Sequence, residues 1–323
     1  MKKIKVAING FGRIGRAFYK VAKDNPDVEV IAVNDLGDVK TMEYLLKYDT
    51  VYGKSDYTLA GVKYLSEKDP TKLPWKDLDI DVVVESTGLF TSAELSKVHI
   101  NAGAKRVVIS APIKDGETIL MGMNEEKLKT CVISSNASCT TNAGSPILAI
   151  LDEALGIEKA LLNTVHGYTA SQALVDGPNK KDLREGRAAA QNLVPSSTGA
   201  AIAVTKVMTG LTGLFDGISI RVPVPCGSIV DITFISKKNT TAEEVNSILK
   251  KAASDARWSG IFTVTEEALV SSDIIGNSHA SIADLSFTRV VGGNLIKVLG
   301  WYDNEMGYTH TLVRHVVEAG KLI

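Results

Sequence analysis

The chain of 323 residues has little cysteine, few aromatic side chains and no long apolar run. Its three cysteines are Cys131, Cys139 and Cys226, and no two of them form a C-x-x-C pair. An odd and small number of cysteines argues against both a disulfide framework and a zinc site. No apolar segment approaches the roughly 20 residues of a membrane helix. The opening Met-Lys-Lys-Ile-Lys leads directly into an apolar stretch, so we expect no signal peptide.

An excess of charge of either sign is also absent. The 36 Lys and Arg residues against 37 Asp and Glu residues give a formal net charge of -1. That balance does not support general binding to nucleic acid or to an anionic membrane. A hydrophobic content of 45% and a charged content of 23% are ordinary for a soluble globular protein. We therefore expect a cytoplasmic protein of two domains, with no metal, nucleic acid or membrane as partner.

A glycine-rich turn near the start predicts a nucleotide site. The apolar strand 4–8 leads into Gly10, Gly12 and Gly15, spaced G-x-G-x-x-G, and a helix is expected over 13–24. In this strand-turn-helix context the first glycine permits the tight turn and the second lets the backbone approach a pyrophosphate. The third lets helix and strand pack closely, and the pyrophosphate sits at the helix N-terminus.

An acidic residue after the second strand favours NAD over NADP. The strand 28–33 ends in Asn34-Asp35, and Asp35 follows Gly15 by about 20 residues, where an acid hydrogen-bonds the ribose hydroxyls. A carboxylate there repels a ribose phosphate. Asp35 could instead be the N-cap of a helix, which would not exclude ribose binding.

The octapeptide Ser135–Asn142 contains the best candidate nucleophile, Cys139. The apolar run that follows it predicts a helix over 143–155, so Cys139 is expected at or near a helix N-terminus. The unpaired N–H groups there favour the reactive thiolate. Cys131, inside an expected strand, and Cys226 are interpreted as small buried hydrophobic residues.

Among the five histidines, His166 has the most suggestive position, at the end of an expected strand and the start of a turn. The other four, which have no comparable setting, are interpreted as surface or hydrogen-bonded structural residues: His99, His279, His310 and His315. Arg221 could be part of an ordinary ion pair on a sheet surface. The charge run Asn179–Arg184 is most simply a solvated loop.

The first part of the chain predicts a doubly wound parallel sheet. Further buried strands are expected at 80–85, 106–110 and 131–135, and a helix ends at 101–104. Their β-branched, nearly continuous apolar character is typical of parallel strands covered on both faces. Alternation of such strands with helices is the pattern of a Rossmann domain.

After Cys139 the pattern changes to consecutive strands. A strand at 161–166 precedes a polar loop over 171–195, and loops of this length are usually functional or interfacial. Helices are then expected at 199–209, at 241–255 and in the tail 305–322, and strands at 217–224, 228–236, 269–275, 280–287 and 294–301. This order predicts an α+β catalytic domain with a mostly antiparallel sheet. The expected division is 1–138 for nucleotide binding, 139–304 for catalysis and 305–323 for a helix packing back on the first domain.

Nine motifs in a fixed order cover nearly the whole chain. They are Asn9–Arg16, Ala32–Asp35, Glu85–Gly88, Ile109–Pro112, Ser135–Asn142, Thr164–Thr169, Pro195–Ala201, Arg221–Pro223 and Trp301–Tyr308. Together they resemble the phosphorylating, NAD-dependent glyceraldehyde-3-phosphate dehydrogenase family.

The resemblance implies that Cys139 attacks the aldehyde carbon of glyceraldehyde 3-phosphate and that His166 serves as base and then as acid. Hydride transfer to NAD leaves a thioester, which inorganic phosphate cleaves to an acyl phosphate. Residues implied to hold the substrate phosphate and the inorganic phosphate are Thr169, Ser171, Arg221, Ser138, Thr140, Thr198, Gly199 and Arg187. Positions implied to bind NAD are Asn9, Gly10, Phe11, Gly12, Arg13, Ile14, Asn34, Asp35, Lys68, Thr87, Gly88, Ser110, Ala111, Pro178, Asn304 and Tyr308.

The chain departs from the family pattern at Ala170, Ile202 and Cys226, where asparagine, lysine and asparagine are common, and it is short between Tyr57 and Pro70. Family members are usually homotetramers with the loop near 171–195 at a subunit interface. The nearest rival is erythrose-4-phosphate dehydrogenase, whose family usually departs at 197–201 and 301–304, where this chain does not. A binding protein that reuses the fold and a cysteine hydrolase are more distant rivals.

Overall fold

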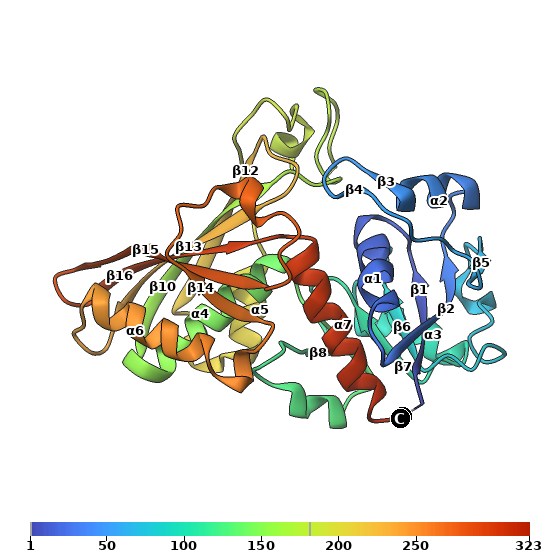
Figure 1. Cartoon of the computed structure of the whole chain (residues 1–323), viewed down its shortest axis with the longest axis horizontal. Helices are drawn as coiled ribbons and strands as arrows, with labels where there is room; N and C mark the ends of the chain where they lie inside the picture. Colours follow the sequence, from blue (N-terminus) through green and yellow to red (C-terminus); the bar gives the residue numbers. More distant parts are fainter. Residues whose placement is uncertain (1, 181) are drawn as a thin grey trace. The chain divides into compact units, whose positions relative to one another are not determined.

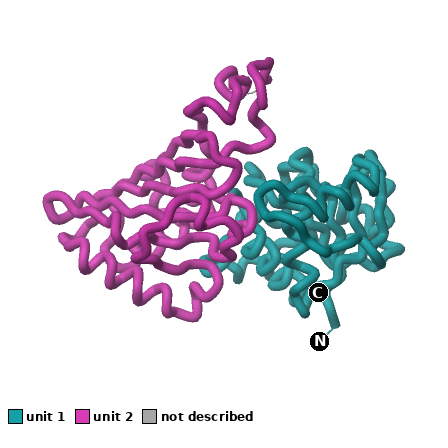
Figure 2. The backbone as a smooth tube through the Cα atoms, turned by 45° about the horizontal axis from the view of Figure 1, so that its top comes forward, with its two compact units in different colours: residues 1–138, 309–323 teal, residues 139–308 magenta. Residues whose placement is uncertain are grey.

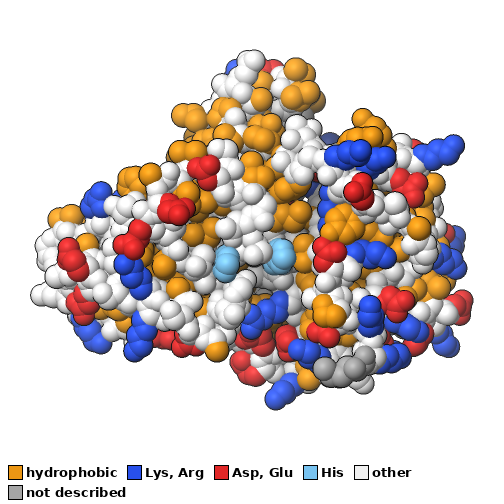
Figure 3. All heavy atoms as spheres, viewed as in Figure 1, with side chains coloured by type: hydrophobic (Ala, Val, Ile, Leu, Met, Phe, Trp, Pro, Cys, Tyr) orange, Lys and Arg blue, Asp and Glu red, His pale blue; other side chains and the backbone are white. Residues whose placement is uncertain are grey.

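The computed structural model describes residues 2–180 and 182–323, which form two compact units. Unit 1 comprises residues 1–138 and 309–323, and unit 2 comprises residues 139–308 (Figure 2). In the described part of the chain, none of the helices combines the length and apolarity needed to cross a bilayer. Basic and acidic side chains are interspersed over the face drawn in Figure 3.

Unit 1 is built on a seven-stranded parallel sheet in the order β5-β2-β1-β6-β7-β9-β8. Its strands are β1 (Ile4–Asn9), β2 (Val28–Asn34), β5 (Lys63–Leu65), β6 (Val82–Glu85), β7 (Arg106–Ile109), β8 (Glu117–Thr118) and β9 (Ile133–Ser135). The central strands β6 and β7 are buried at every position, as expected for a parallel sheet covered on both faces. The predicted doubly wound fold is confirmed.

Four helices belong to unit 1: α1 (Arg13–Lys23), α2 (Val39–Lys47), α3 (Ala93–Asn101) and most of α7 (Met306–Gly320) (Figure 1). Asp38 caps α2 by accepting a hydrogen bond from Thr41 N, so Asp35 is not the N-cap. The small hairpin of β3 (Tyr48–Asp49) and β4 (Gly53–Lys54) and two short 3-10 helices, η1 (Pro70–Lys72) and η2 (Glu125–Lys129), complete the unit. Helices α2 and α3 and strands β5 and β8 were not assigned bounds from the sequence, because their apolar patterns are short.

Unit 2 contains a second seven-stranded sheet, in the order β11-β12-β10-β13-β16-β15-β14. Its strands are β10 (Ile157–Gly167), β11 (Val194–Ser197), β12 (Phe215–Val222), β13 (Ser228–Ser236), β14 (Phe262–Thr265), β15 (Ser281–Val291) and β16 (Leu295–Tyr302). The β10–β12 and β14–β15 pairs are parallel and the other four pairs are antiparallel. The predicted mostly antiparallel sheet is therefore confirmed.

Three helices accompany this sheet: α4 (Cys139–Leu155), α5 (Ala200–Val207) and α6 (Ala242–Ala253). Helix α4 is buried over most of its length, as a core helix without a polar face must be. Thr241 is the N-cap of α6, since its side chain accepts a hydrogen bond from Glu244 N. Short 3-10 helices are η3 (Leu183–Gly186), η4 (Thr209–Leu211), η5 (Ala256–Trp258) and η6 (Ser271–Ile274).

Several sequence-based boundaries are wrong. The strand expected at 269–275 is the 3-10 helix η6, and the real edge strand is β14 at 262–265. The 171–195 loop is not structureless, because it contains η3 and ends in β11, which pairs with β12. Helix α4 begins at Cys139, four residues before the expected start. Short apolar runs flanked by polar residues do not distinguish an edge strand from a 3-10 turn.

Candidate active site

The glycine turn of unit 1 has the geometry that a dinucleotide requires. Gly10 has φ +95°, and a Cβ there would lie 2.6 Å from Thr87 N. A Cβ on Gly15 would lie 2.1 Å from Gly10 O, so helix and turn touch through glycine alone. Gly12 is the N-cap of α1, receives no side-chain cap and faces open space. The first amide groups of α1 are therefore accessible to a phosphate.

Asp35 lies directly after β2, and its carboxylate is oriented by two backbone N–H groups. Phe11 N donates to Oδ2 at 2.7 Å, and Gly37 N donates to Oδ1 at 2.8 Å. The first bond links the acid to the glycine turn, although the two segments are 24 residues apart. The carboxylate is thus held at the carboxyl end of the sheet, where an acid selects a ribose with free hydroxyls.

The other predicted cofactor positions of unit 1 follow the carboxyl ends of its strands, but they differ in what they offer. The Phe11 side chain is fully buried against Tyr19, so it cannot contact a ligand. The Arg13 guanidinium is engaged in an ion pair with Asp49 at 3.1 Å. Asn9 and Asn34 are buried and bonded to each other at 2.8 Å. Thr87 and Gly88 follow β6, Ser110 and Ala111 follow β7, Ile14 is half-buried in α1, and Lys68 is exposed.

Three predicted cofactor positions belong to unit 2. Asn304 is buried, and its Oδ1 accepts hydrogen bonds from Gly227 N at 3.2 Å and Ser228 Oγ at 2.9 Å. Its amide orientation is thereby fixed with the oxygen toward β13. Tyr308 is buried in the first turn of α7, and Pro178 is exposed in the long loop.

Cys139 is the first residue of α4, as expected, and its Sγ lies 3.4 Å from His166 Nε2. The preceding Ala137 has φ +57°, an uncommon conformation for a residue with a Cβ. Ala137 N donates to Ser135 Oγ at 2.9 Å, which holds this turn in unit 1. The chain thus enters the helix sharply at the cysteine.

The start of α4 lowers the pKa of Cys139, as expected, but another effect outweighs it. Burial raises the pKa of the thiol, and the Arg221 guanidinium and the N–H groups at the start of α4 only partly oppose that effect. The effect of desolvation on the pKa is larger than that of the helix N-terminus, because a thiolate at this position has little contact with water. The residue is therefore a thiol that needs a base, rather than a preformed thiolate.

His166 ends β10, and strand register brings it to Arg221. The parallel β10–β12 pairing places His166 opposite Arg221, and Arg221 Nη1 lies 2.6 Å from His166 Nδ1. Burial and the neighbouring guanidinium lower the pKa of His166 to about 3, so the imidazole is neutral near pH 7. Nδ1 also lies 2.6 Å from Gly167 O. The two contacts make opposite demands on Nδ1. Nδ1 accepts from Arg221 when the ring hydrogen is on Nε2, and only the tautomer that donates from Nδ1 to Gly167 O leaves Nε2 free to accept the thiol proton.

Tyr302 is a buried neighbour that sequence reasoning missed. Its hydroxyl lies 3.0 Å from Thr140 Oγ1 and 2.7 Å from Thr164 Oγ1, and its ring contacts His166 edge to face at 5.9 Å. Burial and the nearby Cys139 raise the pKa of Tyr302 well above its usual value. The Trp301–Tyr308 motif contained this residue, but only the β13–β16 pairing shows that it supports the histidine.

The predicted phosphate residues lie in unit 2, apart from Ser138, which ends the first stretch of unit 1. Thr169 Oγ1 and Ser171 Oγ are 3.1 Å apart, and Thr198 Oγ1 accepts from Ala200 N at the start of α5, where Gly199 faces open space. Arg187 is exposed and pairs with Asp176 at 2.9 Å, so its guanidinium is already engaged. Ala170 and Ile202, at positions where the family often has polar side chains, supply no donor.

Two buried side-chain N–H groups have no hydrogen-bond partner within the described part of the chain, namely Arg221 Nε and Gln172 Nε2. Gln172 was not predicted, and its Oε1 accepts from Thr169 N at 3.3 Å. Buried N–H groups without a partner are costly and rare, so each indicates a place for an acceptor. An anion between such donors would satisfy them.

The remaining cysteines and histidines were interpreted with mixed success. Cys226 is buried and donates to Asp303 Oδ1 at 3.2 Å, as a structural residue should. Cys131 lies before β9 rather than inside it and is only half-buried, which corrects the strand assignment. His99 and His315 are buried and hydrogen-bonded, and His279 contacts Asn277. His310 is also outside the candidate site.

Comparison with known proteins identifies the family. Residues 4–93 match the family model described as glyceraldehyde 3-phosphate dehydrogenase, NAD binding domain, and residues 138–304 match its C-terminal domain. The chain is 49% identical to glyceraldehyde-3-phosphate dehydrogenase of Thermotoga maritima, over 96% of this chain and 97% of that protein. It is 47% identical to the enzyme of the same name from Streptomyces coelicolor, over 98% of each.

The enzyme of that name from Geobacillus stearothermophilus is 46% identical over 96% of each chain. All of these matches span both units, including the segments that carry the Cys139–His166 pair and the glycine turn. The chain belongs to the glyceraldehyde-3-phosphate dehydrogenase family, whose N-terminal domain binds NAD.

Proposed function

We propose that this protein oxidises D-glyceraldehyde 3-phosphate with NAD and inorganic phosphate, giving 1,3-bisphosphoglycerate and NADH in glycolysis or gluconeogenesis. The observation that carries the proposal is the thiol–imidazole pair, with Cys139 Sγ 3.4 Å from His166 Nε2 at the start of a buried helix. A hydrolase would need only that pair, whereas the nucleotide-binding fold of unit 1 supports a redox reaction. A pure binding role would not require the pair.

The proposed reaction begins at Cys139. The sulfur attacks the aldehyde carbon while His166 Nε2 removes the thiol proton and passes it to the former carbonyl oxygen, so that a hemithioacetal forms and the imidazole is neutral again. His166 then takes the proton of the hemithioacetal hydroxyl as that carbon loses hydride and becomes a thioester. Bound NAD supplies the hydride acceptor. An oxygen of inorganic phosphate attacks the thioester carbon, the C–S bond breaks, and His166 returns a proton to the sulfur.

His166 suits this role because its imidazole is neutral before it accepts a proton. Its pKa of about 3 follows from burial and from the Arg221 guanidinium, which disfavours a second positive charge. Protonation of His166 would become easier once an anion neutralised Arg221. Binding of a substrate phosphate would therefore make the imidazole a better base at the moment it is needed.

Two anions must be bound in this reaction, one on the substrate and one as co-substrate. The orphan Nε of Arg221 and the Thr169–Ser171 hydroxyl pair support a substrate-phosphate site. Ser138, Thr140, Thr198 and Gly199 are proposed for inorganic phosphate, and the open N-terminus of α5 at Gly199 supports that assignment. Arg187 would have to leave Asp176 to take part.

The residues of unit 1 fit NAD. The uncapped start of α1 would receive the pyrophosphate, and the oriented Asp35 carboxylate would receive the ribose hydroxyls. Asn304 and Tyr308 are proposed for the nicotinamide end. The remaining predicted positions of unit 1 end its strands, follow them or begin α1, and they are proposed to act through backbone groups where their side chains are engaged. Pro178 is proposed as a contact from the long loop of unit 2.

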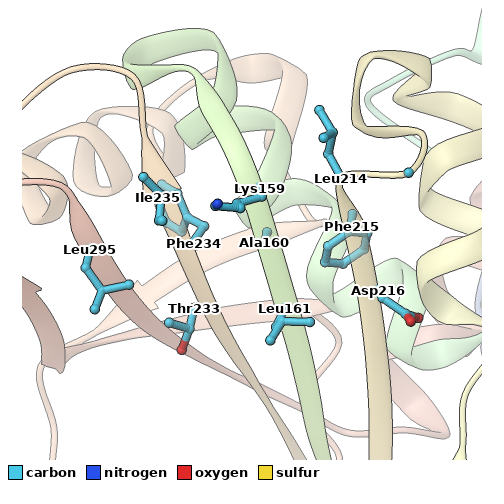
Figure 4. Close-up of a pocket in the computed structure, with 11 residues that line it drawn as sticks. Lys159, Ala160, Leu161, Leu214, Phe215, Asp216, Thr233, Phe234, Ile235 and Leu295 are labelled. Carbon is cyan, nitrogen blue, oxygen red and sulfur yellow. The ribbon is translucent and has the colours of Figure 1, made fainter.

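We also propose a cytoplasmic homotetramer. Hydrophobic side chains gather over the long loop at the top of Figure 3, where Leu174 is 81% and Leu183 is 84% exposed. A hollow of about 600 Å³ on the second sheet is lined by apolar residues, including Leu161, Phe215 and Leu295 (Figure 4). Large exposed apolar surfaces of this kind mark subunit contacts. Sedimentation equilibrium would test the assembly, and a monomer at micromolar concentration would refute it.

The division into residues 1–138, 139–304 and 305–323 stays a proposal. It is supported by the grouping of residues 309–323 with 1–138 and by the hydrogen bond between His315 of α7 and Ser134. The rival activity on erythrose 4-phosphate is not favoured, because the relatives found are glyceraldehyde-3-phosphate dehydrogenases.

The experiment that tests the function measures NADH formation at 340 nm with glyceraldehyde 3-phosphate, with and without inorganic phosphate. Phosphate-dependent turnover with NAD is expected, with less turnover on NADP and on erythrose 4-phosphate. A higher rate on erythrose 4-phosphate would reassign the substrate. Turnover that does not depend on phosphate would reject the acyl-phosphate step.

A further inference from the structure

A buried chain of hydrogen bonds lies beneath the proposed cofactor site of unit 1, and its central members are outside every predicted site. Trp75, His99 and Glu85 have exposed fractions of 0%, 0% and 2%. They come from the loop after η1, from α3 and from the end of β6. Their contacts continue through Asn9 to Asn34 and Glu67.

The direction of the bonds follows from the indole. Trp75 Nε1 can only donate, so His99 Nδ1, at 3.1 Å, must accept. The hydrogen of the neutral ring is then on Nε2, which donates to Glu85 Oε2 at 3.0 Å. Trp75 thus fixes the tautomer of His99, and His99 fixes one carboxylate oxygen of Glu85.

Glu85 is a buried carboxylate with a full set of donors. Asn9 Nδ2 donates to Oε2 at 2.7 Å, and both the backbone N, at 2.8 Å, and the hydroxyl of Thr87 donate to Oε1. A buried carboxylate is costly unless it is bonded in this way. Glu85 lies on β6 directly opposite Asn9 of β1, and packing alone does not explain a carboxylate at this buried position.

Both ends of the chain reach segments that we propose to hold NAD. Thr87 N, placed by Glu85, is the atom against which Gly10 packs, since a Cβ on Gly10 would lie 2.6 Å from it. Asn9 Oδ1 accepts from Asn34 Nδ2 at 2.8 Å. Asn34 in turn holds Glu67 by its backbone N at 2.9 Å and its O at 3.0 Å, next to Lys68.

We propose that Trp75, His99 and Glu85 are positioning residues for the dinucleotide site. They act without touching the ligand, by fixing the glycine turn, the Thr87 loop and the Glu67–Lys68 loop in one arrangement. Asn9 and Asn34 belong to the same chain of hydrogen bonds, because their side chains are bonded to each other and Asn9 is bonded to Glu85. This inference rests on the proposed binding of NAD by unit 1.

The test compares His99→Leu with His99→Gln and Trp75→Phe by calorimetric titration with NAD. Loss of a buried hydrogen-bond partner predicts a Kd for NAD raised about tenfold to hundredfold in His99→Leu and by a smaller factor in Trp75→Phe. His99→Gln keeps one acceptor and one donor and is expected to recover most of the affinity. KM for NAD should rise with kcat at saturating NAD unchanged.

Trp258→Phe is the matched control, because Trp258 is equally buried but lies in unit 2. It should leave the Kd for NAD unchanged, and alkylation of Cys139 should proceed at the wild-type rate in every variant. Wild-type NAD affinity in both His99→Leu and Trp75→Phe would overturn the proposal. An equal loss in Trp258→Phe would also overturn it, as general destabilisation. Absence of NAD binding by the wild-type protein would instead reject the proposed function.

Discussion

In unit 1 the proposed cofactor segments follow one another along the chain and end adjacent parallel strands, whereas in unit 2 the reactive residues come together only through strand pairing. The glycine turn and Asp35 are 24 residues apart and are joined by one hydrogen bond. His166 and Arg221 are 55 residues apart and become neighbours because β10 and β12 are in register. Local motifs therefore describe the first site well and the second only in part.

The two sites also differ in how they treat charge. In unit 1, the side chains of Asp35 and Glu85 accept hydrogen bonds from backbone N–H groups. In unit 2, desolvation moves the pKa values of Cys139, His166 and Tyr302 toward the neutral forms, with Arg221 as the nearby cation. The groups of unit 2 are thus suited to proton transfer between neutral side chains, next to the positive charge of Arg221, which can bind an anion.

The largest effect is expected for Cys139→Ser. The hydroxyl is a much weaker nucleophile, so kcat for aldehyde oxidation should fall by at least a factor on the order of 10⁴. The Kd for NAD should stay unchanged, because Cys139 is not among the residues proposed to bind the nucleotide. Steady-state rates and calorimetric titration would check both, and substantial retained activity would refute the nucleophile assignment.

Replacing Arg221 probes the contact that only strand register creates. Arg221→Leu removes the cation beside His166 and should lower kcat/KM for the substrate by about tenfold to hundredfold, as expected for a hydrogen bond to a charged group. Arg221→Lys retains the charge and should retain part of the activity. Cys139 should remain open to alkylation in both variants. Normal kinetics in Arg221→Leu would reject the phosphate role.

Asp35→Gly tests the locally encoded site. Loss of the carboxylate should reduce the preference for NAD over NADP by about tenfold, because one charge-assisted hydrogen bond and one repulsion disappear. The ratio of kcat/KM values for the two cofactors is the measurement. An unchanged ratio would contradict the ribose contact.

A smaller effect concerns stability and pH. Burial lowers the pKa of His315 from 6.5 to about 3, so the unfolded chain binds a proton between these values and the folded chain does not. Stability is therefore complete above pH 6.5 and is lost as the pH falls toward 3, at about 1.4 kcal/mol per pH unit.

His315→Gln should remove this component. Between pH 7.5 and pH 5.5 the variant should lose about 1.4 kcal/mol less unfolding free energy than the wild type, measured by urea denaturation. The buried His166 titrates in both proteins and cancels in the difference. Identical pH dependence of the two proteins would show that His315 does not titrate in this window.

Much of the fold could be predicted because the relevant signals are local. The apolar runs of β1, β2, β6 and β7 and the glycine turn define the parallel unit without reference to distant residues. The error at 269–275 has the opposite origin. Edge strand β14 is stabilised by pairing with β15, and η6 by turns of its own, and neither leaves a strong periodic pattern.

The candidate site could be predicted as residues but not as an electrostatic environment. Cys139 was correctly expected at a helix start, yet desolvation raises its pKa. Desolvation depends on how the whole unit packs and not on local sequence. Tyr302, Gln172 and the Trp75–His99–Glu85 chain were missed, since an isolated aromatic, amide or histidine has no distinctive local context.

By itself, the sequence determined the nucleotide turn, the acid after the second strand, the reactive cysteine at a helix start and the two-part fold. Each of these features depends on residue types and spacings within a segment of about 30 residues, in which the local strand-turn-helix structure largely determines the backbone geometry. The tertiary structure alone decided which histidine and arginine meet, which pKa values desolvation shifts and which hydrogen-bond chain supports the cofactor loops. Such features depend on register and desolvation, and both arise only when segments far apart in the chain pack together.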